Sequence, residues 1–126
     1  MKKRKKKKTK SYGEYYINYF LKYNNINFIR EKKFENCRSN KNYPLRFDFY
    51  LPEYNILIEF QGKHHYMPVH KYRKAKIIHY KTIENDKIKK EFCENNNISL
   101  IEINYKEIDN IYDKLIEELE KIIPKK

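Results

Sequence analysis

The segment LRFDFYLPEYNILIEFQGKHHY, residues 45–66, decides how this chain folds. Two apolar runs flank the break PEYN at residues 52–55, and this pattern predicts a β-hairpin. Each run contains one acid, Asp48 in the first and Glu59 in the second. Acidic residues are depleted in strands, because a strand is a pleated, half-buried surface. The presence of both acids therefore needs a reason, and the register of the hairpin supplies one.

If the turn is centred between Glu53 and Tyr54, residues at equal distances from that point face each other. Asp48 and Glu59 are equidistant from it, and directly opposed residues project from the same face of a sheet. Opposed like charges destabilise a sheet. A divalent cation such as Mg²⁺, which prefers carboxylate oxygens, would neutralise them. The ordinary alternative is that both acids pair with Arg46 or nearby lysines on a solvated face.

Alternation along the two strands divides the hairpin into two faces. We expect one face to be wholly apolar and to form the core, and the other to collect the polar residues. The predicted core face consists of Leu45, Phe47, Phe49, Leu51, Ile56, Ile58 and Phe60. The predicted opposite face consists of Arg46, Asp48, Tyr50, Leu57, Glu59 and Gln61.

The rest of the chain predicts helices and strands on both sides of this hairpin. The predicted helices are 11–25, 82–97 and 107–123, and the further strands are 26–37 and 98–105. Ser11 and Thr82 are the expected helix N-caps, and residues 65–81 are expected to form an exposed connection. The order of elements predicts an α/β fold, a small mixed sheet of about four strands flanked by helices.

Positive charge is concentrated at the N-terminus. The 126-residue chain has a formal net charge of +12, and eight of these charges lie in MKKRKKKKTK, which leaves only +4 elsewhere. A block of like charges cannot pack, which predicts a disordered tail at 1–10 before a single domain at 11–126. We expect the tail to bind nucleic acid or to act as a nuclear import signal, with a solubilising tail as the alternative. The predicted nucleic-acid-binding residues are Lys2, Lys3, Arg4, Lys5, Lys6, Lys7, Lys8 and Lys10.

Cysteine use and hydropathy indicate an intracellular protein. Cys37 and Cys93 are the two cysteines and form no CxxC motif, which fits a reducing compartment. No apolar stretch follows the basic start and no run is long enough to cross a bilayer, so we expect neither a signal peptide nor membrane association. The basic tail suggests a nuclear location in a eukaryotic host and a cytoplasmic one otherwise.

Further polar residues follow the hairpin at suggestive spacings. Gln61 lies two positions after Glu59, which places it on the same face. His65 follows closely and can hydrogen-bond a metal-bound water or move a proton near neutral pH. The ordinary alternatives are a solvated helix residue for Asp86 and a surface charge for Lys89. The set expected to share one helix face comprises Asp86, Lys89, Lys90 and Cys93.

Five features, taken in order along the chain, resemble the PD-(D/E)xK nuclease superfamily. They are Glu14, RFDFYLP, IEFQGKHHY, DKIK and ISLIEINY, and they extend from about Gly13 to Tyr105. The likeness is greatest to the branch of very-short-patch repair endonucleases and EDxHD homing endonucleases. It implies a restriction-endonuclease-like core and a Mg²⁺-dependent DNA endonuclease, in which Mn²⁺ would substitute for Mg²⁺.

The resemblance also implies roles for individual residues. Asp48 matches the metal-binding aspartate and Glu59 matches the acid of the second motif, so both would hold the metal. Gln61 stands where the superfamily usually has lysine, and this departure leaves open which group activates water. The other matching residues are Glu14 on the first helix, His65 after the QG turn, and the downstream pair Asp86 and Lys89.

The implied partner is DNA, and a double-strand cut by one small domain would suggest a homodimer. One alternative is a zinc-bearing HNH-type nuclease, although the compact ligand spacing of a zinc site is not found. Its ligands would come from His64, His65, His70, His79 and Cys93. A second alternative is a non-catalytic nucleic-acid-binding protein on a decayed nuclease fold. The paired acids argue against it, because a phosphate binder gains nothing from them.

Overall fold

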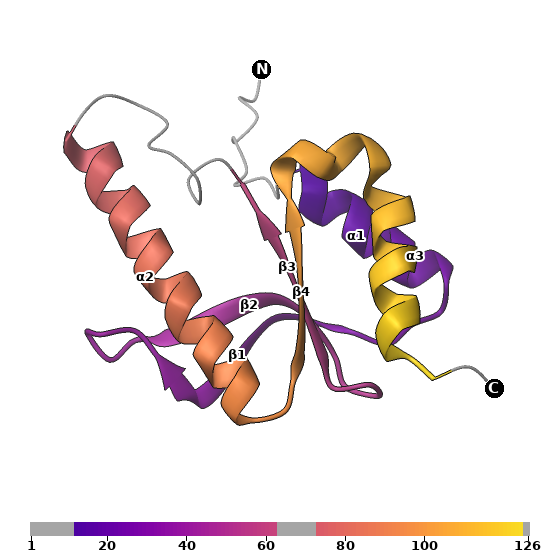
Figure 1. Ribbon diagram of the computed structural model, residues 1–126, viewed down its shortest axis with the longest axis horizontal. Helices are drawn as coiled ribbons and strands as arrows, with labels where there is room; N and C mark the ends of the chain where they lie inside the picture. The colour runs from indigo at the N-terminus through magenta and orange to yellow at the C-terminus, as the bar shows by residue number, and fades with distance from the viewer. Residues whose placement is uncertain (1–11, 63–72, 125–126) are drawn as a thin grey trace, which may run out of the picture.

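The computed structural model describes residues 12–62 and 73–124. These residues form an α/β fold, a four-stranded mixed sheet with three α-helices packed against it (Figure 1). No helix in these two ranges is long and apolar enough to span a membrane. In chain order the elements are α1 (Tyr12–Tyr23), β1 (Ile29–Arg38), β2 (Pro44–Leu51), β3 (Ile56–Gln61), α2 (Arg73–Asn95), β4 (Ser99–Asn104), the 3₁₀ helix η2 (Tyr105–Asn110) and α3 (Ile111–Ile122). The expectations that fall outside the described residues concern the basic tail, Ser11, His64, His65 and His70.

The sheet confirms the predicted hairpin register. Its strand order is β1-β2-β3-β4, with two antiparallel pairs followed by a parallel pair between β3 and β4. In the hairpin, Phe49 pairs with Ile58 and Leu51 pairs with Ile56, as the predicted turn centre requires. Asn55 completes the turn with a φ of 56°, a left-handed conformation that asparagine adopts more readily than most residues.

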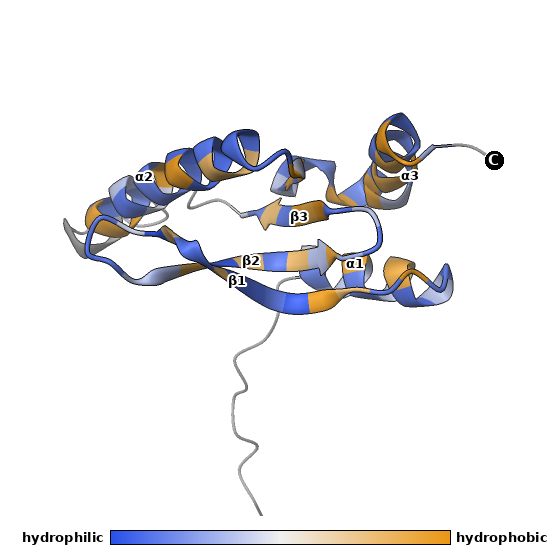
Figure 2. Cartoon of the chain, turned by 90° about the horizontal axis from the view of Figure 1, so that it is seen from below, coloured by the Kyte–Doolittle hydropathy of each residue, from blue (hydrophilic) through white to orange (hydrophobic). Residues whose placement is uncertain are grey.

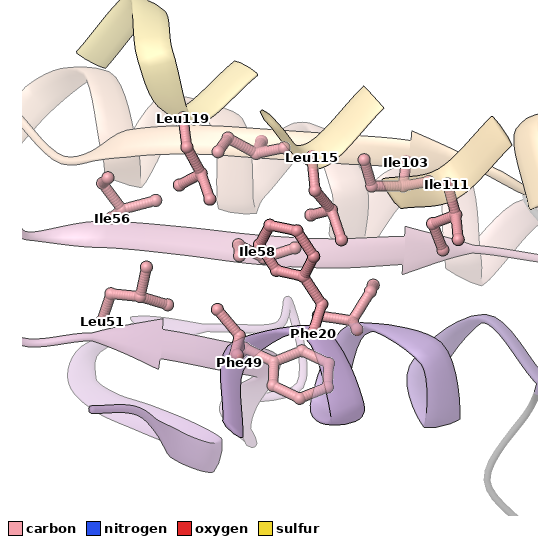
Figure 3. Close-up of a cluster of buried hydrophobic side chains, with 12 residues drawn as sticks. Phe20, Phe49, Leu51, Ile56, Ile58, Ile103, Ile111, Leu115 and Leu119 are labelled. Carbon is pink, nitrogen blue, oxygen red and sulfur yellow. The ribbon is translucent and has the colours of Figure 1, made fainter. Parts of the chain in front are cut away.

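Helices cover both faces of the sheet, and each face has its own hydrophobic core. Figure 1 shows α2 on one side of the sheet and α1 and α3 on the other. The core beneath α1 and α3 is built around the fully buried Phe49, Ile58 and Leu115 (Figure 3). The core beneath α2 contains Phe47 and Leu57. The hydropathy colours are mostly orange along the central strand β3 and mostly blue along the edge strand β1 (Figure 2).

The predicted division of the hairpin faces is wrong for Leu45 and Phe47. Both pack in the core beneath α2, whereas Phe49 and Leu51 pack beneath α1 and α3. The side-chain alternation therefore shifts once, at Asp48. Backbone pairing between β2 and β3 ends at Phe49. Beyond it, backbone N–H groups donate to the carboxylate oxygens of Asp48 and Glu59 instead. Such bonds do not enforce alternation as a continuous backbone ladder does.

The helix predicted at 82–97 begins much earlier, at Arg73, so the described part of the expected connection is helical. Thr82 lies inside this helix and is not an N-cap, because its hydroxyl donates to the carbonyl of Ile78 at 2.9 Å. The early turns of α2 carry exposed residues such as Lys76 and Tyr80. These turns show no apolar stripe in the sequence, so the pattern of hydrophobic residues did not predict that they are helical.

Gly13 allows α1 to approach the end of β3 closely. It is buried, and a Cβ at this position would overlap the ring of Phe60. Phe60 also follows Glu59 directly, so the contact places the start of α1, with Glu14, beside the paired acids.

Gly13→Ala should destabilise the protein by about 1–3 kcal/mol, because overpacking forces the Phe60 ring or α1 to move. Alanine by itself favours a helix by about 1 kcal/mol over glycine, so a net loss would show that packing dominates. Urea denaturation measures the change, and the double variant Gly13→Ala/Phe60→Leu should recover part of it. A Gly13→Ala protein as stable as the wild type would contradict the close contact.

Candidate active site around Asp48 and Glu59

The two acids of the hairpin lie side by side, and each is bonded to the backbone of the facing strand. The backbone N–H of Asp48 donates to Glu59 Oε2 at 2.8 Å, and the N–H of Phe60 donates to Asp48 Oδ2 at 2.8 Å. These bonds lie just beyond the point where β2 and β3 stop pairing. Glu59 is 5% exposed. Its carboxylate is therefore buried, whereas the ordinary alternative placed it on a solvated face of the sheet.

Lys89 reaches this pair from α2. Its Nζ lies 2.8 Å from Glu59 Oε1, and the two side chains are only 14% and 6% exposed. The ammonium also lies 5.0 Å from the centroid of the Phe47 ring, which adds a cation–π attraction. Lys89, which the resemblance in sequence implies as a site residue, therefore contacts Glu59 directly.

Burial raises the pKa of both carboxyls, and repulsion from Asp48 adds to the rise at Glu59. Desolvation raises the pKa of Glu59 to about 7, the charge of Asp48 adds to the rise, and Lys89 opposes it. Desolvation also raises the pKa of Asp48, against the hydrogen bond from Phe60 and the charges of Lys89 and Arg30. The two groups titrate as a pair. Near neutral pH the pair therefore retains part of a proton, which a bound cation would displace.

Glu14 joins the site from α1 through Arg30. The Arg30 guanidinium donates from Nη2 to Glu14 Oε1 at 2.8 Å and from Nε to the carbonyl oxygen of Asp48 at 3.2 Å. Burial and then the charge of Asp48 raise the pKa of Glu14, while Arg30 lowers it. Sequence reasoning missed Arg30, because β1 carries a register shift near its end and its alignment with β2 cannot be read from the loop.

Gln61 is held by Glu102, a second residue that sequence reasoning missed. Gln61 Nε2 donates to Glu102 Oε2 at 2.8 Å, and Lys90 Nζ lies 3.6 Å from Glu102 Oε1. An ionised carboxylate only accepts hydrogen bonds, so Glu102 fixes the amide of Gln61 with its nitrogen toward β4. The parallel register places Glu102 beside Glu59. Both are lone acids in apolar strands, and this shared signal could have found Glu102.

Of the remaining predicted residues, the structure describes Asp86, and it shows no hydrogen bond or ion pair between Asp86 and the pair formed by Asp48 and Glu59. Asp86 is partly exposed on α2, about one helical turn before Lys89 and Lys90. His65 and the basic tail lie outside the described residues.

The described zinc candidates do not converge. His79 and Cys93 both lie on α2, where their spacing corresponds to about 21 Å along the helix axis. Zinc ligands bind within about 2.0–2.3 Å of the ion, so these two residues cannot share one. Burial raises the pKa of the Cys93 thiol to about 12, which also keeps it in the form that does not bind metal.

The oxygen atoms around Asp48 fit a hard cation that takes only one or two ligands from the protein. Among residues 12–62 and 73–124, no group of three or more His, Cys, Asp or Glu is arranged to hold a metal ion. Mg²⁺ commonly takes one or two carboxylates and completes its shell with waters and phosphate oxygens. No hydrogen bond from the described residues occupies Asp48 Oδ1. This oxygen and the neighbouring Glu59 carboxylate are therefore the protein ligands such an ion would use.

Comparison with known proteins yields one partial likeness. The chain is similar to the uncharacterized protein 307L of Invertebrate iridescent virus 6, with 33% identity over 79 residues. The match covers 60% of this chain and 40% of that protein, so the chain spans about two fifths of the length of this relative. No family model matches the chain. No solved structure matches it.

We expect the metal-free protein to lose stability as the pH rises from 4.5 through about 7. A carboxyl with a raised pKa holds more protons in the folded than in the unfolded state across that interval, and stability falls with pH wherever this is so. Glu59→Gln removes the titration, so its thermal midpoint should fall less over the same range. Melts in EDTA at several pH values measure both proteins, and identical pH profiles would contradict the raised pKa.

Proposed function

We propose that this protein is a Mg²⁺-dependent endonuclease that hydrolyses phosphodiester bonds in DNA. The observation that carries the proposal is the pair of carboxylates, half-buried Asp48 and buried Glu59, held between facing strands beside Lys89. Replacing a buried ion pair by apolar residues is often neutral or stabilising. A chain selected only to fold would therefore have little reason to keep these charges, whereas strongly perturbed carboxyls are typical of functional sites.

The arrangement of elements supports a restriction-endonuclease-like core with a PD-(D/E)xK-type site. A helix, an antiparallel three-stranded meander, a helix and a parallel strand follow one another in the described chain. Glu14 comes from α1 on one face of the sheet, and Lys89 comes from α2 on the other. Hydrogen bonds and an ion pair thus connect Glu14, through Arg30, and Lys89 to this pair of acids, and these contacts support the proposal.

Asp48 and Glu59 would hold the metal. Bound there, Mg²⁺ supplies charge stabilisation on the phosphate and a lower pKa for the attacking water. Glu59 would give up its residual proton on binding, since its pKa is about 7 in the metal-free protein. Lys89 would then be released from Glu59, and its ammonium would contact the scissile phosphate.

The departure at Gln61 has a consistent role in this scheme. An amide cannot provide the positive charge of the usual lysine, and Lys89 would provide it instead. The Gln61 nitrogen donates to Glu102, so the amide oxygen is the atom that can accept a hydrogen bond from water. His65 would orient or deprotonate that water, because imidazole titrates near neutral pH. The remaining acids of the proposed site are Glu14, acting outside the first coordination sphere or on a second metal ion, and Asp86, one turn before Lys89.

Affinity for DNA would come mainly from the basic residues between Lys2 and Lys10. Lysine-rich arms neutralise phosphates and release counterions whatever the base sequence. Mn²⁺ would replace Mg²⁺, because it also binds hard oxygen ligands. A double-strand cut would require two such sites, so we propose a homodimer for that activity.

Glu59→Gln should abolish plasmid cleavage with Mg²⁺ or Mn²⁺, because it removes one of the two charges that hold the ion. We expect a fall of roughly 100-fold or more, since losing even an outer-shell partner of a metal site costs about 10- to 100-fold. The matched control is Glu53→Gln in the turn of the same hairpin, where the exposed carboxylate bonds Asn27 at 3.0 Å. It should cut at the wild-type rate.

The cleavage rates of the wild type, Glu59→Gln and Glu53→Gln are measured from the amounts of nicked and linear plasmid that form over time. A wild-type protein that binds DNA but never cuts it would overturn the proposal in favour of the non-catalytic alternative. Equal cutting by Glu59→Gln and wild type would remove Glu59 from the metal site.

A further inference from the structure

Charge is distributed unevenly between the described fold and the N-terminal segment. Residues 12–62 and 73–124 contain all 17 acids of the chain and 17 Lys and Arg, so they are neutral in sum. The eight basic residues of the N-terminal segment have no acid among them. Within the fold, η2 and α3 (residues 105–122) hold six acids and three lysines, a net charge of −3. The strongest negative region of the fold is thus η2 and α3.

A cavity of about 580 Å³ opens between the start of α1 and the junction of η2 with α3. Three tyrosine rings contribute to it, and those of Tyr16 and Tyr112 meet edge to face with centroids 6.1 Å apart. Asp109 and Asp113 are exposed at its wall and form no ion pair with any described residue. The full lining is Tyr12, Tyr16, Ile108, Asp109, Asn110, Ile111, Tyr112 and Asp113.

This combination of groups fits an ammonium or guanidinium ion. Aromatic faces attract such cations within about 6 Å of the ring centroid, and two carboxylates without local partners attract them further. The neighbouring acids Glu107 and Glu118 are already paired, because Lys114 Nζ lies 3.4 Å from Glu107 and 3.3 Å from Glu118. The cavity therefore keeps its negative charge for a cation from elsewhere.

The basic N-terminal segment is attached at the rim of this cavity. Tyr12, the first described residue, is part of the lining and is 77% exposed. Lys10 is two residues away, about 7 Å of extended chain, and its side chain adds further reach. A tethered segment experiences an effective concentration in the millimolar range, so even weak individual contacts would keep it bound.

We propose that lysine side chains of residues 2–10 dock in this cavity of the same molecule, with their ammonium groups between the tyrosine rings and Asp109 and Asp113. The N-terminal segment then has two competing partners, the cavity and a polyanion. Phosphates displace it from the cavity, so the segment is covered until nucleic acid is present. The docking itself does not depend on nuclease activity. Its release by DNA rests on the proposed function.

Limited trypsin digestion of the full chain tests the docking, because trypsin cleaves after lysine and arginine and a docked segment is protected. In Asp109→Asn/Asp113→Asn, loss of the N-terminal residues should be about threefold faster or more, as expected from losing two weak ion pairs. The matched control is Glu91→Gln/Glu94→Gln, which removes the same charge from two exposed positions on α2. It should be cleaved like the wild type. Intact-mass spectrometry at early times gives the rates.

Raising the salt concentration should speed cleavage of the wild type and leave the double variant almost unchanged, because screening weakens exposed ion pairs. Equal cleavage rates in all three proteins at low salt would overturn the proposal. Protection that grows with protein concentration would overturn it too, since it would place the segment in the cavity of a second molecule.

Discussion

Asp48 and Glu59 each accept a hydrogen bond from the backbone of the facing strand, and the surrounding structure is arranged to tolerate a half-buried and a buried acid side by side. The backbone ladder between β2 and β3 stops there. Phe47 and Phe49 fall on opposite faces of the sheet, one in each core. In the neighbouring strand, Glu31 lies opposite Asp48 in the β1–β2 register and has a left-handed φ of 54°. Compensating charge comes mainly from outside the hairpin, from Lys89 on α2 and Arg30 on β1, and Arg46 of β2 adds to it at Asp48.

The sequence was sufficient for the hairpin and insufficient for its surroundings. A short turn and a period of two leave one register that opposes the two acids, and the structure has that register. The shift of faces at Asp48 could not be predicted, because alternation assumes an unbroken ladder and a carboxylate–amide bond is a tertiary contact. The position of Glu102 beside Glu59 depends on a parallel register. Parallel neighbours need a long crossover, here including α2, so no turn specifies that alignment.

The balance of energies at this site favours a functional explanation. Two carboxylates and a lysine lose hydration on burial, and their attraction offsets this cost only with good geometry and further hydrogen bonds. The bonds are present: both acids accept from backbone N–H groups, and Lys89 lies 2.8 Å from Glu59. Even so, the pKa of Glu59 remains raised to about 7. The hydrogen bonds and Lys89 therefore offset only part of the cost of burying the two carboxylates. A divalent cation bound there would offset more of that cost.

The most direct measurement is calorimetric titration of Mn²⁺ into the metal-free protein near pH 7, repeated in buffers with different ionisation enthalpies. We expect one ion per chain and a measurable release of protons, because burial raises the pKa of Glu59 to about 7 and Glu59 must ionise to bind. Proton release should disappear at pH 9 and in Glu59→Gln, whose affinity should also fall. Absence of Mn²⁺ binding by the wild type, or binding that Glu59→Gln leaves unchanged, would contradict the assignment of Asp48 and Glu59 as a metal site.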